Sequence, residues 1–397
     1  MKRAIFQLGT LLMLACISTA TRAMDNLPDG VQLHGFASQS LISTDHNNFF
    51  GQTQDSASLG FTELGANISW RINPKVQMSA QAISRRAGET DNGTPRLDYA
   101  TLDLTAYADE TSRYGLYLGK IKNPYGLYNE TRDVAFARPS ILLPQSIYFD
   151  RLRNFSLASP GISLYSQNRL AVGDLSMQIS AVRPNASDEE SERTFLGKSQ
   201  PGSIDSKTSY IGRLLLEPDN SRLKLALTGV QINAQYQPGG GDALQAGVID
   251  FRSWILSAQY NAENWVLTSE YARRRIVETG FGPFFLNGTT YGTSYYVQGA
   301  YTLSPRWSVL ARYDYSVADD ADKDGIKFQS KSGLPAYSRF AQDWTAGVTY
   351  NASRSWQLRG EYHHVDGTFW LPYGDNTNPA STARYWNMWL LQAAYRF

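Results

Sequence analysis

The segment that decides the fold is the last one, Tyr385-Trp-Asn-Met-Trp-Leu-Leu-Gln-Ala-Ala-Tyr-Arg-Phe397. From Trp389 onward every second residue is apolar or aromatic, whereas Gln392 and Arg396 fall on the opposite face. Successive side chains of a β-strand point to opposite faces, so this alternation suits a strand with lipid on one side and water on the other. The segment therefore predicts a transmembrane β-strand that ends on an aromatic residue.

The first 23 residues predict a cleaved secretory signal peptide. Two basic residues precede an apolar stretch over 4–17 that is too short to span a bilayer, and a small-residue site follows. We place cleavage after Ala23, with Ala20 as the alternative and lipidation of Cys16 as a third option. Ordinary cleavage removes the only cysteine, so the mature chain 24–397 can form no disulfide.

The composition argues against nucleic-acid binding and permits a barrel. The formal charge is +1, and removing the three leader cations leaves −2, which gives no bulk attraction for nucleic acid. Mean hydropathy is only −0.37, but a barrel hides its lipid-facing side in alternation. Aromatic residues make up 13% of the chain, which suits the girdles at membrane interfaces.

Runs of period 2 bounded by turn residues predict sixteen strands. They lie at 31–45, 57–73, 75–87, 95–109, 112–126, 160–169, 174–183, 206–217, 222–236, 250–261, 264–277, 293–303, 306–318, 341–351, 355–366 and 385–397. Short turns alternate with longer connections along the whole series. An even number of strands with this loop asymmetry indicates an all-β fold, a 16-stranded antiparallel transmembrane β-barrel. A soluble β-sandwich also alternates, but the asymmetry and the leader disfavour it.

Charged residues on the water-facing side of the strands predict a water-filled lumen. Arg312 and Asp314 alternate with apolar residues in one strand, and Arg359 and Glu361 do so in another. The candidate pore-wall residues are Glu63, Arg71, Arg213, Glu270, Arg312, Asp314, Arg359 and Glu361.

The longest connection, about 128–159, is the candidate constriction. Its cations, with two lysines just upstream, are Arg132, Arg138, Arg151, Arg153, Lys120 and Lys122. Guanidinium groups in a narrow, partly desolvated passage interact with anions far more strongly than in bulk water. One hypothesis is that these cations favour anionic or polar solutes. The other is that the arginines pair with carboxylates and pin the loop to the wall.

The acidic segment 320–325 is a weak calcium candidate. Asp320, Asp322 and Asp324 have the spacing that opens a calcium-binding loop, but the twelfth position is Lys331, which excludes a complete EF-hand. The alternative is a solvated acidic loop. No other cofactor is expected.

Aromatic residues crowd two further connections, at 281–291 and 369–373. Exposed rings could stack on sugar faces, and packing within the loops is the alternative. Catalysis is not expected: His363 and His364 are adjacent in a strand and point to opposite faces, and no nucleophile motif accompanies the other histidines. Too few residues precede the first strand to form a plug.

The sixteen strands, the long third loop and Phe397 resemble the Gram-negative outer-membrane porins, and Gly119-Lys-Ile-Lys-Asn-Pro-Tyr-Gly-Leu127 is loosely similar to the phosphate-selective group. The resemblance implies a homotrimer in the outer membrane, surrounded by lipopolysaccharide, with the third loop folded into the pore and the terminal aromatic read by the barrel-assembly machinery. The function it implies is passive diffusion of small hydrophilic solutes, with anion preference as a hypothesis. The alternatives are a channel specific for saccharides or organic anions, a barrel enzyme such as a phospholipase or omptin-like protease, and a non-conducting structural barrel.

Overall fold

The computed structural model describes residues 27–219, 222–285 and 287–397, so the predicted signal peptide 1–23, with Cys16, lies outside the described residues. Within the described part, eighteen strands form one antiparallel sheet, and all but the short β4 (Asp91–Asn92) and β9 (Ser203–Ser206) make the wall. The sixteen wall strands are β1 (Val31–Thr44), β2 (Ser58–Asn73), β3 (Val76–Ala87), β5 (Arg96–Ala108), β6 (Ser112–Lys122), β7 (Ala158–Leu170), β8 (Gly173–Val182), β10 (Ser209–Pro218), β11 (Leu223–Gln237), β12 (Val248–Asn261), β13 (Trp265–Thr279), β14 (Gly288–Thr302), β15 (Trp307–Val317), β16 (Phe340–Asn351), β17 (Trp356–Gly367) and β18 (Tyr385–Arg396). The predicted 16-stranded barrel is confirmed.

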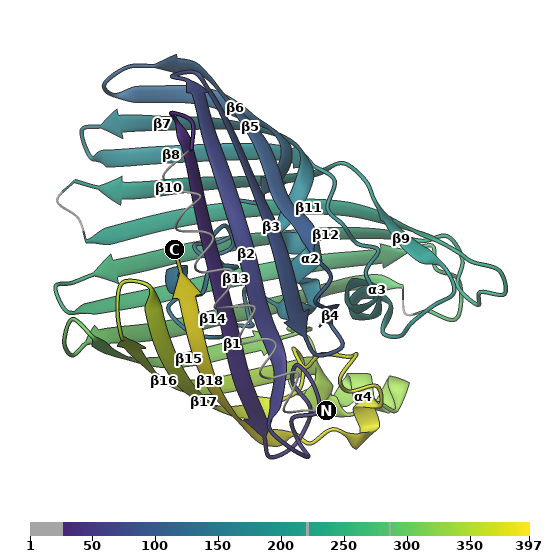
Figure 1. Cartoon of the computed structure of the whole chain (residues 1–397). Helices are drawn as coiled ribbons and strands as arrows, with labels where there is room; N and C mark the ends of the chain where they lie inside the picture. Colours follow the sequence, from purple (N-terminus) through teal and green to yellow (C-terminus); the bar gives the residue numbers. More distant parts are fainter. Residues whose placement is uncertain (1–26, 220–221, 286) are drawn as a thin grey trace.

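The barrel closes between its first and last strands. β1 pairs with β18 from Phe36 opposite Arg396 to Thr44 opposite Met388 (Figure 1). Beyond that ladder, Phe397 N donates to the Gly35 carbonyl at 3.1 Å and Gly35 N donates to the Phe397 carbonyl at 3.2 Å. A Cβ on Gly35 would lie 2.2 Å from the Phe397 ring, so the ring fits only over a glycine. Closure pairs the backbone groups that an open sheet would leave unpaired in lipid.

Deleting Phe397 is expected to impair assembly, because the deletion removes two closing hydrogen bonds and the ring that covers Gly35. The measurement is heat-modifiable gel migration of the protein recovered from cells. A Phe397→Trp variant keeps a ring and a backbone and should assemble close to the wild type. An equal folded yield for the deletion would contradict this account.

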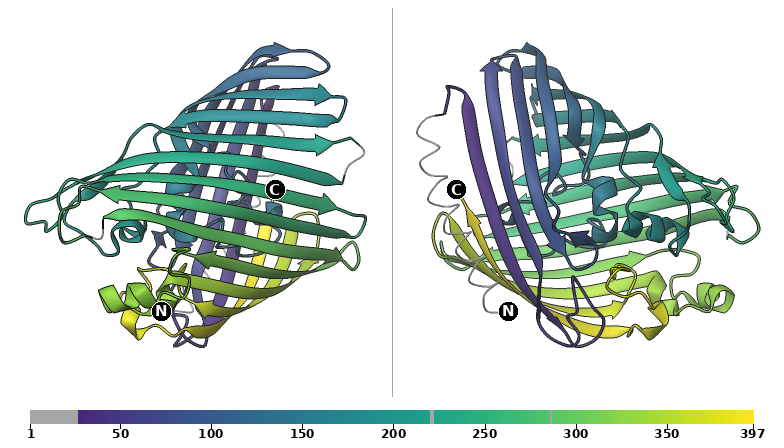
Figure 2. Two further views of the ribbon diagram at one scale, coloured as in Figure 1. Left: turned by 180° about the vertical axis from the view of Figure 1, so that it is seen from behind. Right: turned by 45° about the vertical axis from the view of Figure 1, so that its right-hand side comes forward.

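The two faces of the wall differ as the alternation predicts. Trp344, Trp307 and Leu391 on the outer face are 61%, 46% and 60% exposed, whereas Asp314 and Glu361 of the inner face are buried. Short turns lie at one end of the barrel and the long loops at the other (Figure 2). None of the described helices is long and apolar enough to cross a membrane.

The loops carry short helices that the sequence reading missed. These are η1 (Ala135–Ala137), η2 (Asp150–Leu152), α2 (Arg153–Ser156), α3 (Glu189–Leu196), α4 (Ile326–Ser332), η3 (Ala336–Arg339) and η4 (Pro379–Ser381). In order, loops one to eight span 45–57, 88–95, 123–157, 183–208, 238–247, 280–287, 318–339 and 368–384. Three apolar clusters, which include Phe251, Trp386 and Tyr296, pack residues of loops one, three, four, five, six and eight against the inner wall.

Candidate lumen site formed by loop three

Loop three lies inside the barrel rather than over its rim. Its helix α2 sits within the ring of strands in both views (Figures 1 and 2). Side chains of the loop bond to strands on opposite sides of the wall, for example Arg138 to Glu63 of β2 and Tyr148 to Glu270 of β13. The loop therefore spans the lumen from wall to wall.

Two asparagines close the neck of loop three where it leaves the wall. Asn123 N donates to the Leu157 carbonyl at 3.0 Å, and Asn129 Nδ2 donates to the carbonyls of Asn123 and Ser156 at 3.0 and 2.9 Å. Both asparagines are fully buried. Because these bonds tie the two ends of the loop together, the loop behaves as one compact body. In the sequence, this neck is indicated by the turn-forming residues Asn123, Pro124 and Gly126.

The predicted constriction arginines are all buried and partnered. Arg138 forms a two-bonded ion pair with Glu63 at 2.7 and 3.3 Å. Arg153 pairs with Asp133, and Arg132 pairs with Asp150 at 3.3 Å. These contacts agree with the pinning hypothesis, because each guanidinium group bonds to a neighbouring carboxylate or carbonyl.

Arg151 fastens loop three to the outer loops. Its Nη1 donates to the Phe369 carbonyl at 2.7 Å, its guanidinium lies 3.5 Å from the centre of the Tyr373 ring, and Glu190 of α3 is 3.8 Å away. Arg151 therefore links loop three with loops four and eight.

The two predicted lysines have different positions. Lys122 lies inside the barrel and bridges Asp98 of β5, at 2.7 Å, and Asp133 of loop three. Lys120 instead donates to the Leu97 carbonyl at 2.7 Å, and its register partner Ala100 shares the outward face with exposed Leu118. Lys122 thus contacts loop three, whereas Lys120 bonds to a carbonyl of β5, and its assignment to the constriction stays a prediction.

Nearly all the predicted pore-wall residues anchor loop three. Arg359 donates to three loop carbonyls at 2.7 to 3.3 Å, while Glu361 accepts the amides of Ile141 and Leu142. Arg312 donates to the Leu142 carbonyl at 3.1 Å. The remaining anchors are Glu63, Arg213, Glu270 and Asp314, which bond to Arg138, Glu130, Tyr148 and Ser146 respectively. Arg71 is the exception and lies exposed near the short-turn end of β2.

Arg85 of β3 is a lumen residue that the sequence reading missed. It pairs with Asp150 at 3.1 Å and lies 5.1 and 5.3 Å from the ring centres of Phe50 and Phe61. With three loop-three arginines it encloses a cavity of about 10 Å³, which has room for about one water molecule. Its inward position follows from strand alternation and could have been found that way.

Two carboxylates join the outer loops above loop three. Asp375 of loop eight accepts backbone amides of Phe50, Gly51 and Glu89 at 2.9 to 3.1 Å. Glu190 of α3 accepts the amides of Tyr373 and Gly374. Loops one, two, four and eight are therefore docked to one another at the mouth.

Docking of these loops is expected to strengthen as the pH falls. Burial raises the pKa of Asp375 from 3.8 to about 6, helped by the nearby Glu190 carboxylate. The docked loops hold the Asp375 proton more tightly than the undocked loops do. Protonation of Asp375 therefore stabilises docking by about 3 kcal/mol below about pH 3.8, and this stabilisation is lost as the pH rises through about 6. The measurement is amide exchange protection of Phe50 and Gly51 at about pH 5 and about pH 7.5.

Asp375→Asn should remove most of this pH dependence. Asp55→Asn, at an exposed acid of loop one, is the matched control and should retain it. Equal protection of the wild type at both pH values, after correction for intrinsic exchange, would contradict the assignment.

The acidic segment of loop seven does not assemble a calcium site. Asp322 accepts the amides of Lys327 and Phe328 at 3.0 and 2.7 Å, whereas Asp320 accepts the Thr293 hydroxyl at 3.0 Å. Among the described residues no group of three or more His, Cys, Asp or Glu could hold a metal ion. Asp322 and Asp324 therefore hold backbone amides of the loop, Asp320 holds the Thr293 hydroxyl of β14, and the calcium hypothesis lacks a ligand set.

Most aromatic side chains of loops six and eight are packed against other residues. Phe281 is fully buried and stacks on Tyr236, and Trp370 is buried against Phe49 and Trp386. Phe284, at 80% exposed, is free at the tip of loop six. A continuous row of rings for sugar stacking is not formed by these residues.

His363 has the one carboxylate–histidine arrangement inside the described barrel. Its Nδ1 lies 2.8 Å from Asp343 and its Nε2 lies 3.4 Å from Glu361, and the ring is 1% exposed. Both ring nitrogens face carboxylates, and the Thr345 hydroxyl lies 3.1 Å from Nδ1, so His363 joins β16 and β17 through a buried polar network.

No family model matches the sequence, and no curated protein is a significant relative. Solved structures are similar in fold. The outer membrane channel DcaP of Acinetobacter baumannii has a TM-score of 0.59 at 14% identity, over 92% of this chain and 97% of that one. The trimer form of OmpT, an outer membrane protein of Vibrio cholerae, gives 0.57 at 12% identity, over 92% and 99%. OmpF of Salmonella typhi, in complex with daunomycin, gives 0.54 at 14%, over 92% and 97%. The chain therefore has the fold of the porins, the closed sixteen-stranded barrel of the Gram-negative outer membrane.

Proposed function

We propose that the protein is a passive outer-membrane channel for small hydrophilic solutes in which loop three sets the conductance. The observation that carries this proposal is the polar character of the contacts between loop three and the barrel wall. Loop three meets the wall through guanidinium–carbonyl and carboxylate–amide bonds, such as those of Arg359 and Glu361, alongside apolar contacts. Water and polar solutes can replace such bonds, so the packed state described here is a low-conductance state of a channel.

A weak anion preference follows from the charges. The loop-three arginines are offset by Glu63, Asp133 and Asp150, whereas Arg312 and Arg359 have no ion-pair partner within the described residues. These two guanidinium groups bond to carbonyl and side-chain oxygens only. They supply the excess positive potential that would draw anions into the passage.

Planar-bilayer recording of the purified protein tests the proposal. We expect small stepwise currents and a reversal potential, in a salt gradient, that indicates a modest preference for chloride over potassium. High salt should weaken the preference because it screens exposed charges. Stepwise current separates a channel from an enzyme or a structural barrel, and complete silence at every voltage would rule the channel out.

We also propose a homotrimeric assembly. Ala66, Ala80, Ala82 and Ala100 adjoin one another on the outer side of β2, β3 and β5, which offers a patch of small residues beside Trp70 and Met78. Small residues let two transmembrane walls approach closely. One structural neighbour is described as a trimer, which agrees with this assignment. The barrel-assembly machinery is the partner that we propose for the terminal strand.

A further inference from the structure

Phe50 of loop one has a backbone conformation that is unfavourable for a bulky side chain. Its φ is 56°, and Asn47 is the only other non-glycine residue with a positive φ in the described part of the chain. In the left-handed region Cβ comes too close to the following carbonyl oxygen. Phe50 is fully buried, and such a conformation persists only where the surrounding contacts impose it.

Asp375 of loop eight imposes the conformation of Phe50. Its Oδ2 accepts the Phe50 amide at 2.9 Å, and its Oδ1 accepts the Gly51 amide at 3.1 Å. A Cβ on Gly88 of loop two would lie 2.5 Å from Asp375 Oδ1, so loop two also closes tightly on this carboxyl group. Because buried amides need acceptors, the backbone at Phe50 can relax only when loop eight moves away.

The ring of Phe50 connects this backbone to the lumen. Its centre lies 5.1 Å from the Arg85 guanidinium carbon, and Arg85 pairs with Asp150 of loop three at 3.1 Å. The other two acids that face Arg85, Glu63 and Asp91, lie 3.7 and 3.8 Å away, beyond hydrogen-bonding distance. A buried ring attracts the guanidinium group over its face, so Phe50 holds Arg85 in the orientation that reaches Asp150.

We propose that Phe50 couples the docking of the outer loops to the anchoring of loop three. When loop eight separates from loop one, Phe50 leaves the left-handed conformation, its ring moves off Arg85, and the ion pair with Asp150 weakens. The mouth and the constriction then loosen together. The effect on passage rests on the proposed function, in which loop three sets the conductance. The coupling is reciprocal, so displacing Arg85 from Asp150 weakens docking at the mouth by the same factor.

Amide exchange of the folded barrel in detergent at about pH 7.5 tests this coupling. The reporters are Tyr148 and Leu152 of loop three, whose amides donate to carbonyls within the loop. Asp375→Asn replaces one acceptor oxygen by an NH2 group and should lower the protection of both reporters about tenfold. The Gln245 amide, which joins loops five and six, should keep its protection.

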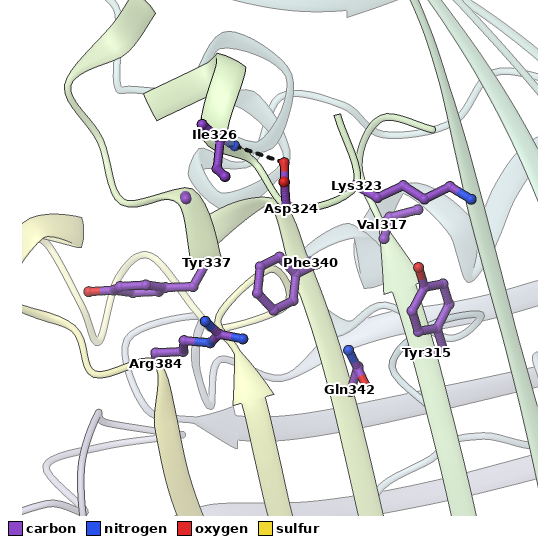
Figure 3. A pocket seen from close by; sticks show the side chains of 10 residues that line it. Tyr315, Val317, Lys323, Asp324, Ile326, Tyr337, Phe340, Gln342 and Arg384 are labelled. Atoms are coloured by element: carbon purple, nitrogen blue, oxygen red, sulfur yellow. Dashed lines mark hydrogen bonds between the residues drawn. The ribbon is translucent and has the colours of Figure 1, made fainter. Parts of the chain in front are cut away.

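A second bond of loop eight supplies the matched control. The Tyr337 hydroxyl of loop seven donates to the Thr382 carbonyl. Tyr337 lines a cleft of about 390 Å³ between loop seven and β16, together with Phe340 and Arg384 (Figure 3). Tyr337→Phe removes this bond but leaves the Asp375 carboxyl group in place, so the two reporters in loop three should exchange as in the wild type.

Phe50→Gly tests the route of the coupling. Glycine adopts a positive φ without strain, so loops one and eight should stay docked, but no ring remains over Arg85. The protection of the reporters should fall about tenfold, and adding Asp375→Asn should lower it no further. Phe50→Leu keeps an apolar side chain without a ring and should also make the reporters insensitive to Asp375→Asn. Heat-modifiable migration confirms that each variant is folded.

Unchanged protection of Tyr148 and Leu152 in Asp375→Asn would overturn the coupling. Effects of Asp375→Asn and Phe50→Gly that multiply in the double variant would also overturn it, because independent changes add in free energy. Single-channel recording of the same variants distinguishes the coupling from the channel function. Lowered protection in a barrel that passes no current would uphold the coupling and refute the channel.

Discussion

The double variant Arg359→Gln/Glu361→Gln is expected to convert the barrel into a channel of large and noisy conductance. Arg359 donates to the carbonyls of Ala135, Arg138 and Ser140, and Glu361 holds the amides at the tip of loop three. Hydrogen bonds to charged groups contribute about 1.5–3 kcal/mol each. Because glutamine keeps part of this bonding, we count a net loss of about 1.5 kcal/mol for each of the two anchors, which should raise the population of the released loop on the order of a hundredfold.

The measurement is single-channel recording of the wild type, the double variant and Gln357→Ala. Gln357 is the matched control, because it lies on the same face of β17 and is equally buried but bonds to Asn351 of the neighbouring strand. It should leave the conductance unchanged. Wild-type currents in the double variant would mean that loop three is held by other contacts or does not limit passage.

Glu63→Gln is expected to increase the preference for anions and to loosen loop three. Glu63 is 1% exposed and accepts two bonds from Arg138, with Arg85 3.7 Å away. Removing one member of a buried ion pair costs about 3–5 kcal/mol, because the remaining charge is left buried without compensation. The uncompensated guanidinium groups should shift the reversal potential toward that of chloride.

Asp103→Asn is the control for that experiment. Asp103 is also an inward carboxylate paired with an arginine, Arg113 at 2.8 Å, but it lies on β5 away from loop three. Its substitution should change selectivity much less than Glu63→Gln. If the two variants shift the reversal potential equally, the selectivity depends on total lumen charge and not on the loop-three cluster.

The strand pattern made the wall predictable, and it also made the inward charges predictable. The period-2 runs located each wall strand because the two faces meet different solvents, and the same alternation pointed Glu270 and Glu361 into the lumen. The loop residues that bond to these carboxylates could not be predicted from strand alternation. The Arg138–Glu63 pair joins residues far apart in the chain, and no periodicity connects a loop with a particular strand.

The loops were less predictable for a related reason. Asp188 caps the N-terminus of α3, because its side chain accepts the Ser191 amide, but in the sequence this capping residue lies among many other polar residues. The aspartate spacing in loop seven suggested a calcium site, but the Asp322 carboxylate accepts backbone amides instead. A carboxylate in a turn can bind either a cation or an amide, and spacing alone does not distinguish the two.

The contacts that hold loop three also set the order in which this chain must mature. Arg138 bonds to a residue 75 positions earlier, whereas Arg359 and Glu361 meet the loop across 219 to 224 positions. Contacts between such distant parts of a chain form slowly because long segments must first be brought together. Loop three can complete its docking only when β17 has entered the wall. We therefore expect loop three to dock late in the formation of the barrel.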